Sequence, residues 1–128
     1  MVIAIVLTDF EHAREIIKEK ENDKCYFELR LDADPRLLLL VTENVVSPSR
    51  VILTVRTKAQ GGKLETGNKR RVLLDHSLEL DVEYLDLELI TDSERLQNLI
   101  ENPEKLNPIN LIVSHHNFDQ VMKPGFFE

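Results

Sequence analysis

The sequence predicts a single α/β domain built around a parallel β-sheet. Short runs of β-branched and aliphatic residues alternate along the chain with longer amphipathic stretches, which is the pattern of strand-helix units around such a sheet. The 128 residues fit one ordinary domain of roughly 100–200 residues, and the hydrophobic share of 42% is large enough to fill a core. No linker or low-complexity stretch divides the series, so we expect one domain.

We expect five strands, at residues 2–7, 25–31, 51–56, 84–90 and 111–115. Each is a short run rich in valine, isoleucine, leucine or aromatic residues and bounded by polar or turn-forming positions. The pair Asn107-Pro108 interrupts the chain just before the last of them.

The first two helices are expected directly after the first two strands. Thr8 and Glu11 form the pattern of a capping box, whose side-chain oxygens accept hydrogen bonds from free amides, before a helix over residues 11–20. Asp34-Pro35 opens the second helix with proline at its first position, and residues 37–41 supply the buried face.

The other two helices are expected after the third and fourth strands. The third covers about residues 63–79. Thr91 and Glu94 repeat the capping-box pattern before the fourth. The apolar residues that share one face of this fourth helix are Leu96, Leu99 and Ile100.

The charge balance and the cysteine content limit the class of protein. The chain carries 16 Lys and Arg against 23 Asp and Glu, a net charge of −7, whereas a general nucleic-acid binder needs a basic surface to displace counterions. Cys25 is the single cysteine, which favours a reducing compartment. The apolar start of the chain is too short to span a bilayer. We expect a soluble cytoplasmic protein that binds neither nucleic acid nor membrane.

Charged side chains gather on one face of the expected strands. Because side chains alternate along a strand, residues two apart share a face. The residues on this polar face are Glu28, Arg30 and Asp32, then Thr54 and Arg56, then Tyr84, Asp86 and Glu88, and finally Ile112, Ser114 and His116.

The opposite faces are expected to pack under the helices, including Leu89 at the end of the fourth strand and Val113 in the fifth. Ligands of α/β folds bind at the carboxyl ends of parallel strands, so we expect a site on the polar face at that end. An antiparallel sheet with one solvated face is the alternative, because it gives the same alternation without a site.

Four short motifs stand in order on the expected strands. They are Glu28-Leu29-Arg30-Leu31-Asp32, Leu53-Thr54-Val55-Arg56-Thr57 followed by Gly61-Gly62, Tyr84-Leu85-Asp86-Leu87-Glu88-Leu89, and Ser114-His115-His116-Asn117-Phe118. In this order and spacing the chain resembles the family of type I 3-dehydroquinate dehydratases over about residues 2–119.

The resemblance implies a (β/α)8 barrel, present here as an incomplete barrel of about five parallel strands with four intervening helices. It implies an enzyme of the shikimate pathway of aromatic amino acid biosynthesis. The reaction dehydrates 3-dehydroquinate to 3-dehydroshikimate through a Schiff base on a lysine. No metal or cofactor is implied, because the protonated Schiff base itself is the electron sink.

The resemblance places Glu28, Arg30 and Arg56 in contact with the substrate. Arginine suits a hydroxy-acid substrate because its planar fork can pair with a carboxylate through two hydrogen bonds. His116 corresponds to the general acid and base of the family. It shares the face of Ser114, and imidazole titrates near neutral pH, as proton transfer in this reaction requires.

Two further features of the polar face have alternative interpretations. Asp86 and Glu88 are expected to support the site by orienting His116 or Arg30, and the alternative is a catalytic carboxylate pair. The adjacent His115 and His116 could suggest a metal site. Neighbours on a strand point to opposite faces, so we expect no metal there.

The sequence departs from the family in three respects. A (β/α)8 barrel needs roughly 200–250 residues, so residues 1–119 are expected to form a partial barrel and residues 120–128 an atypical tail. The Schiff-base lysine belongs on a sixth strand, and we do not expect Lys123 in the tail to replace it. Gln60 stands where a carboxylate is usual, and residues 5–7 lack the substrate-binding serine of many members.

These departures leave more than one function open. The chain is either a dehydratase that is inactive without its sixth strand, or a non-catalytic half-barrel that self-associates or binds a small hydroxy acid. An unrelated barrel-type binder of sugar acids is a further alternative. Because five strands leave two unpaired edges and exposed apolar surface, we expect a homo-oligomer, specifically a dimer.

Overall fold

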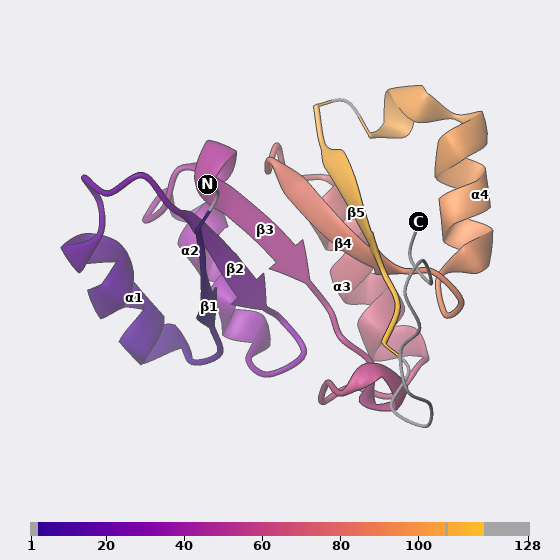
Figure 1. The fold of residues 1–128 in the computed structure, drawn as a ribbon, viewed down its shortest axis with the longest axis horizontal. Coiled ribbons are helices and arrows are strands. Elements are labelled where there is room, and N and C mark those ends of the chain that lie inside the picture. The colour runs from indigo at the N-terminus through magenta and orange to yellow at the C-terminus, as the bar shows by residue number, and fades with distance from the viewer. Residues whose placement is uncertain (1–2, 107, 117–128) are drawn as a thin grey trace, which may run out of the picture.

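The computed structural model describes residues 3–106 and 108–116. Within these residues the chain forms one parallel sheet whose strands lie side by side in sequence order (Figure 1). The strands are β1 (Ala4–Leu7), β2 (Tyr26–Arg30), β3 (Val51–Thr54), β4 (Tyr84–Glu88) and β5 (Asn110–Ser114). The parallel pairing excludes the antiparallel alternative.

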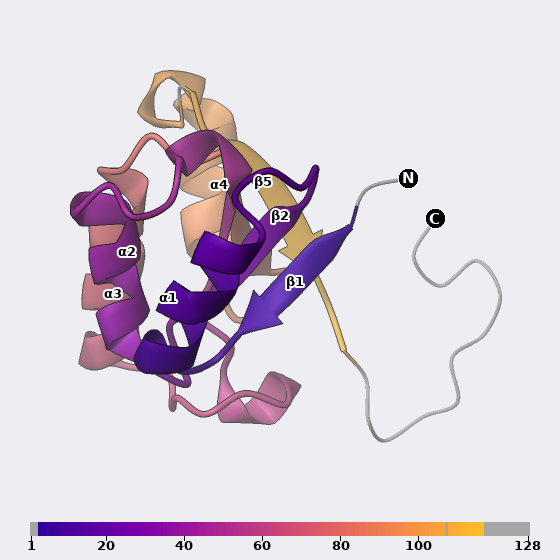
Figure 2. The same ribbon diagram turned by 90° about the vertical axis from the view of Figure 1, so that its left-hand side faces the viewer.

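Helices fill the connections between the strands. The α-helices are α1 (Phe10–Glu19), α2 (Leu38–Thr42), α3 (Asn68–Leu78) and α4 (Ser93–Glu101), and the 3₁₀ helices are η1 (Pro35–Leu37), η2 (Pro48–Arg50), η3 (Lys58–Gln60) and η4 (Pro103–Lys105). Because crossovers between parallel strands are right-handed, sequential strand order puts every helix on the same face of the sheet. Figure 2 shows the helices gathered on that side. This is the arrangement of part of a (β/α) barrel, and the predicted fold class is confirmed.

The core lies between the sheet and the helices. Leu29, Leu53 and Leu85 pair in register across β2, β3 and β4, and all are fully buried. Ala13 and Ile17 of α1 pack against the same core. The apolar faces predicted from the two-residue alternation are therefore confirmed for the three central strands.

Four residues predicted to be buried are exposed instead, among them Leu39 of α2, which is 43% exposed. β4 ends before Leu89, which lies in the following turn and is 51% exposed. Val113 lies on β5, which within residues 3–106 and 108–116 pairs with β4 alone, and is 50% exposed. Ile100 of α4 is also exposed, because it lies at the flank of the stripe formed by Leu96 and Leu99.

Three of the predicted helix starts are displaced. Asp9, not Thr8, caps α1, and its carboxylate accepts a hydrogen bond from the backbone amide of His12 at 2.9 Å. The third helix begins at Asn68 and not near residue 63, because the preceding residues form a loop in which Leu64 pairs back to Thr57, just after β3. The capping box predicted at Thr91 does not form, since Asp92 precedes α4 and its carboxylate has other partners.

Some expectations fall outside the described residues. These are the domain boundary at residue 119, the tail over residues 120–128, Lys123, and the final Asn117-Phe118 of the fourth motif. Within the described ranges, none of the helices has the length and apolar content needed to cross a membrane.

Candidate functional site

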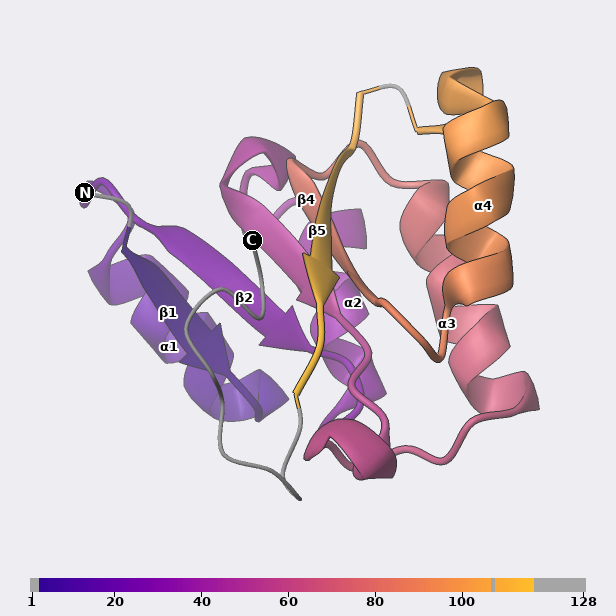
Figure 3. The same cartoon turned by 45° about the vertical axis from the view of Figure 1, so that its right-hand side comes forward.

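The polar faces of the strands meet at their carboxyl ends. Figure 3 shows β2, β3 and β5 pointing toward one loop, which carries η3. Parallel pairing in register places Glu28 beside Ile52, Arg30 beside Thr54, and Thr54 beside Asp86. The side chains at this end therefore come from four strands and the loop after β3.

Arg56 lies at the centre of this group and is 7% exposed. Its Nη1 donates to Asp86 Oδ1 at 3.1 Å and to Ser114 Oγ at 2.6 Å, and the Ser114 hydroxyl lies 2.7 Å from the same carboxylate oxygen. No hydrogen bond among the described residues uses its Nη2. Every fully buried side-chain nitrogen and oxygen among them has a partner, so this nitrogen faces solvent and is available to a ligand.

Glu88 holds the chain that follows Arg56. Its two carboxylate oxygens accept from the backbone amide of Thr57 at 2.9 Å and from the Thr57 hydroxyl at 2.8 Å. The same carboxylate lies 3.7 Å from Arg56 Nη1 and is almost completely buried. The side-chain partners of Asp86 and Glu88 are therefore Arg56, Thr57, Arg70 and Ser114, whereas Arg30 binds another carboxylate.

That carboxylate is Asp32, which joins β2 to the β3 loop. Arg30 donates to both of its oxygens, each at 3.0 Å, and the backbone amides of Arg56 and Lys63 donate to it at 3.1 Å. Burial raises the pKa of Asp32, but the Arg30 and amide hydrogen bonds outweigh burial, so the pKa lies below its ordinary value of 3.8. The hydrogen bonds to Asp32 in turn raise the pKa of Arg30.

Glu28 lies one layer further from the carboxyl ends. Its Oε2 accepts a hydrogen bond from the Thr54 hydroxyl at 2.7 Å, and its side chain is half-buried. Beneath it, the rings of Tyr26 and Tyr84 form an edge-to-face pair with centroids 5.6 Å apart. Burial, together with Tyr84 and Glu83, raises the pKa of Tyr26.

His116 and Gln60 meet at the end of β5. The backbone amide of His116 donates to Gln60 Oε1 at 2.5 Å. Gln60 is held there by two glycines: Gly61 adopts a φ of 91°, and a Cβ on Gly62 would lie 2.3 Å from the carbonyl oxygen of Arg56. The Gly61-Gly62 pair therefore lets the loop fold back against Arg56.

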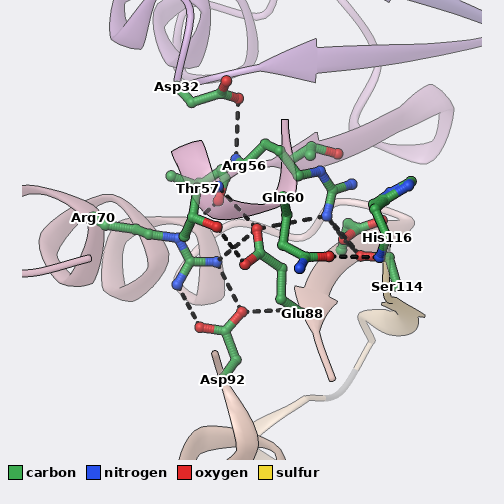
Figure 4. A network of polar contacts seen from close by, with 12 residues as sticks. Asp32, Arg56, Thr57, Gln60, Arg70, Glu88, Asp92, Ser114 and His116 are labelled. Carbon is green, nitrogen blue, oxygen red and sulfur yellow. Dashed lines mark hydrogen bonds and ion pairs between the residues drawn. The ribbon is translucent and has the colours of Figure 1, made fainter. Parts of the chain in front are cut away.

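Arg70 and Asp92 belong to the same network, and sequence reasoning missed both. Figure 4 shows Glu88 lying between the side chains of Arg70 and Arg56. Arg70 comes from α3 and is 4% exposed, while Asp92 precedes α4 and is 6% exposed. An arginine beside Arg71 on a helix gives no sequence signal of burial, so only the packing of α3 against the strand ends identifies it.

The site holds more carboxylates than guanidiniums. Arg30 and Arg56 offer planar donors to an anionic ligand, and Asp32, Asp86 and Glu88 fix those donors in place. A small hydroxy acid fits such a surface chemically, because its carboxylate can take guanidinium donors while its hydroxyls use the carboxylate acceptors.

A second acidic group lies outside this site. Carboxylate oxygens of Asp9, Glu11 and Asp34 lie within 4.8 Å of one another. Arg36 donates to Glu11 at 2.8 Å and to Asp34 at 2.8 Å, and these hydrogen bonds lower the pKa of both carboxyls. The guanidinium already occupies two of the three carboxylates, so we assign no metal to the cluster.

Comparisons with known proteins agree with the geometry. Residues 1–124 match the model of the family described as type I 3-dehydroquinase. The chain is 39% identical over 71 residues to a pentafunctional AROM polypeptide of Lachancea thermotolerans, which covers 54% of the chain and 4% of that polypeptide. It is 36% identical over 73 residues to a bifunctional 3-dehydroquinate dehydratase/shikimate dehydrogenase of Arabidopsis thaliana, covering 56% and 12%.

A bacterial relative aligns along most of the chain. The 3-dehydroquinate dehydratase of Streptococcus sanguinis is 24% identical over 132 aligned positions, which cover 94% of the chain and 53% of the relative. The chain therefore spans about half the length of that relative, and far less of the multifunctional ones.

Proposed function

Because the chain belongs to the type I 3-dehydroquinase family, we propose that it carries part of the active site of a 3-dehydroquinate dehydratase. One observation carries the proposal: a continuous series of hydrogen bonds joins the four motifs. It runs from Arg30 to Asp32, from Asp32 to the amide of Arg56, and from the Arg56 guanidinium to Asp86 and Ser114. These residues come from β2, the end of β3, β4 and β5.

In the proposed reaction, Arg30 and Arg56 bind the substrate through its carboxylate and hydroxyl groups, and Glu28 accepts from a substrate hydroxyl. A lysine of a sixth strand condenses with the substrate ketone to form the Schiff base with loss of one water, and hydrolysis of the Schiff base after the elimination releases the product and frees the lysine. His116 removes the proton next to the iminium carbon and then protonates the leaving hydroxyl, which departs as water. Asp86 and Glu88 hold Arg56 in position, and no metal or cofactor takes part.

Turnover is proposed to require a sixth strand in addition to the five described here. The five strands supply the binding arginines and the histidine, while the nucleophile lies on the sixth strand. We propose that residues 1–119 form this partial barrel domain and that the 128-residue chain alone is inactive. A substrate-binding surface without a nucleophile binds but does not turn over.

Borohydride trapping with 3-dehydroquinate tests this division of roles. The 128-residue chain should give no reduced lysine adduct by mass spectrometry. A chimera in which the remaining strands of the Streptococcus sanguinis dehydratase follow residue 116 should give one, because it regains the nucleophile. His116→Ala in that chimera should still form the adduct but slow dehydration by about 100-fold or more. A chimera that folds but forms no adduct contradicts the proposal.

Exposed apolar residues at the sheet edges favour a second role, self-association. Ile3 and Val6 at β1 are more than half exposed, and Val113 on β5 is half exposed. We propose that the chain forms a homodimer, either as a step in building the enzyme or as a non-catalytic half-barrel.

Cys25 is the single cysteine, and a reducing cytoplasm remains the proposed location.

A further inference from the structure

The buried pair of Arg70 and Asp92 has no place in the proposed reaction, yet it touches the same network. Arg70 donates from both terminal nitrogens to the Asp92 carboxylate, at 2.8 Å for Nη2 and Oδ2, and from Nε to the carbonyl oxygen of Val55 at 2.8 Å. Asp92 Oδ2 also accepts from the backbone amide of Glu88 at 2.7 Å. The pair therefore ties α3 and the start of α4 to the ends of β3 and β4.

Glu88 lies between two guanidiniums. Its Oε2 is 3.7 Å from Arg56 Nη1 and 3.8 Å from Arg70 Nη2 (Figure 4). Burial lowers the pKa of Arg70, but Asp92 and the nearby Glu88 and Asp86 more than offset burial, so Arg70 remains cationic. Arg70 therefore shares the negative charge of Glu88 with Arg56.

This sharing decides how much positive charge Arg56 can offer to a ligand. In the intact network, Arg56 and Arg70 face the carboxylates of Asp86, Glu88 and Asp92. Without Arg70, Arg56 would be the one guanidinium left beside Asp86 and Glu88, and an anion approaching its Nη2 would meet a more negative surface. Buried charges are poorly screened, so the difference reaches the ligand position.

We propose that Arg70 and Asp92 are positioning residues for Arg56. Arg70 offsets part of the negative charge that Glu88 presents to Arg56, and the pair keeps the Glu88 carboxylate hydrogen-bonded to Thr57, so that Arg56 can bind an anionic hydroxy acid. This inference rests on the proposed function, because it concerns how Arg56 meets its substrate. It gives the two members of one ion pair opposite effects on ligand affinity, which a purely structural role does not.

The test measures binding of 3-dehydroquinate by calorimetry to the 128-residue chain. Arg70→Met, which keeps the length but removes the charge, should weaken binding by about tenfold, because a poorly screened positive charge near Arg56 is lost. Asp92→Asn should strengthen binding several-fold. Without the Asp92 charge, Arg70 pairs with Glu88 alone, and Arg56 then offsets less of the Glu88 charge. Arg71→Met is the matched control, since Arg71 is exposed and binds only Asn68 of the same helix. It should bind like the unmodified chain.

If both pair variants weaken binding equally, the pair is merely structural and the inference is overturned. Amide hydrogen exchange gives a readout that needs no ligand. Arg70→Met should speed exchange of the Thr57 amide, which Glu88 holds, by about tenfold or more, while Asp92→Asn should leave it protected. An unmodified chain that binds no 3-dehydroquinate contradicts the proposed function. Unchanged Thr57 exchange in Arg70→Met contradicts the inference by itself.

Discussion

Asp32 shows how much one carboxylate can organise. It is 5% exposed and accepts hydrogen bonds from the Arg30 guanidinium and from the amides of Arg56 and Lys63. Those amides belong to the loop that carries the candidate site, so Asp32 fixes the loop to β2. An ionised carboxylate is needed for this role, because a protonated one cannot accept all of these bonds.

Stability should therefore fall in acid through Asp32. Its pKa is lower in the folded chain than its ordinary value of 3.8. Its stabilising contribution is complete above that value and is lost as the pH falls through the folded-state pKa. Asp32→Asn should cost about 2 kcal/mol at pH 7. Urea unfolding between pH 6 and pH 2.5 should show a smaller acid loss for the variant, and an equal loss would contradict this assignment.

Sequence alone identified the residues that face the site from the strands, and missed those that support them from the helices. Arg30, Arg56 and Glu88 follow from strict alternation, because a strand has only two faces. Arg70 and Asp92 do not, because a charged residue on a helix is usually solvated and nothing in the sequence shows that α3 turns this one inward. For the same reason, the sequence does not show that Glu88 lies between Arg56 and Arg70.

At the scale of elements, β3 ends where side chains take over its backbone donors. The sequence predicts strands to residues 56 and 90, but β3 ends at Thr54 and β4 at Glu88. The amide of Arg56 goes to Asp32 and that of Thr57 to Glu88, so neither can join a ladder. Alternation continues past these points in the sequence, which is why the pattern overestimates strand length.

Arg50 plays a comparable part at the opposite end of the sheet. Its guanidinium donates to the carbonyl oxygens of Lys20, Glu21, Asp23 and Cys25 at 2.6–3.1 Å. It also lies 4.8 Å from the centroid of the Phe27 ring. These contacts close the connection between α1 and β2, where the Lys20 and Asp23 carbonyls also accept hydrogen bonds from backbone amides.

We expect Arg50→Met to lower the free energy of unfolding by about 2–3 kcal/mol, because several charge-assisted hydrogen bonds are lost at once. Urea denaturation followed by circular dichroism measures the change. Arg95→Met is the control: Arg95 pairs with the exposed Asp75 at 2.9 Å, and such a surface pair is worth less than about 1 kcal/mol. Equal losses in both variants would show that Arg50 is only a surface residue.

For the whole molecule, the important feature is that the sheet formed by the described residues is open. The helices cover one face of the sheet. The other face carries the polar network at the carboxyl ends of the strands and apolar side chains further toward their amino ends, among them Val6 of β1. Among the described residues, β1 and β5 each have a single strand neighbour. Unpaired edges next to exposed apolar residues promote pairing with another chain.

The proposed homodimer can be tested at Val6, which is 53% exposed and pairs in register with Glu28. Val6→Lys places a lysine opposite a glutamate, so the monomer should tolerate it, but burying that lysine in a dimer interface costs several kcal/mol. Sedimentation velocity should show a concentration-dependent dimer for the unmodified chain and a monomer for Val6→Lys.

The matched control is Val72→Lys, at an exposed apolar residue of α3 away from the sheet edge. It should dimerise like the unmodified chain. If Val6→Lys still dimerises, the interface does not include β1. If the unmodified chain stays monomeric at high concentration, the proposed dimer does not form. In that case the open face must remain solvated, and the polar network then holds the strand ends in place without cover from a second chain.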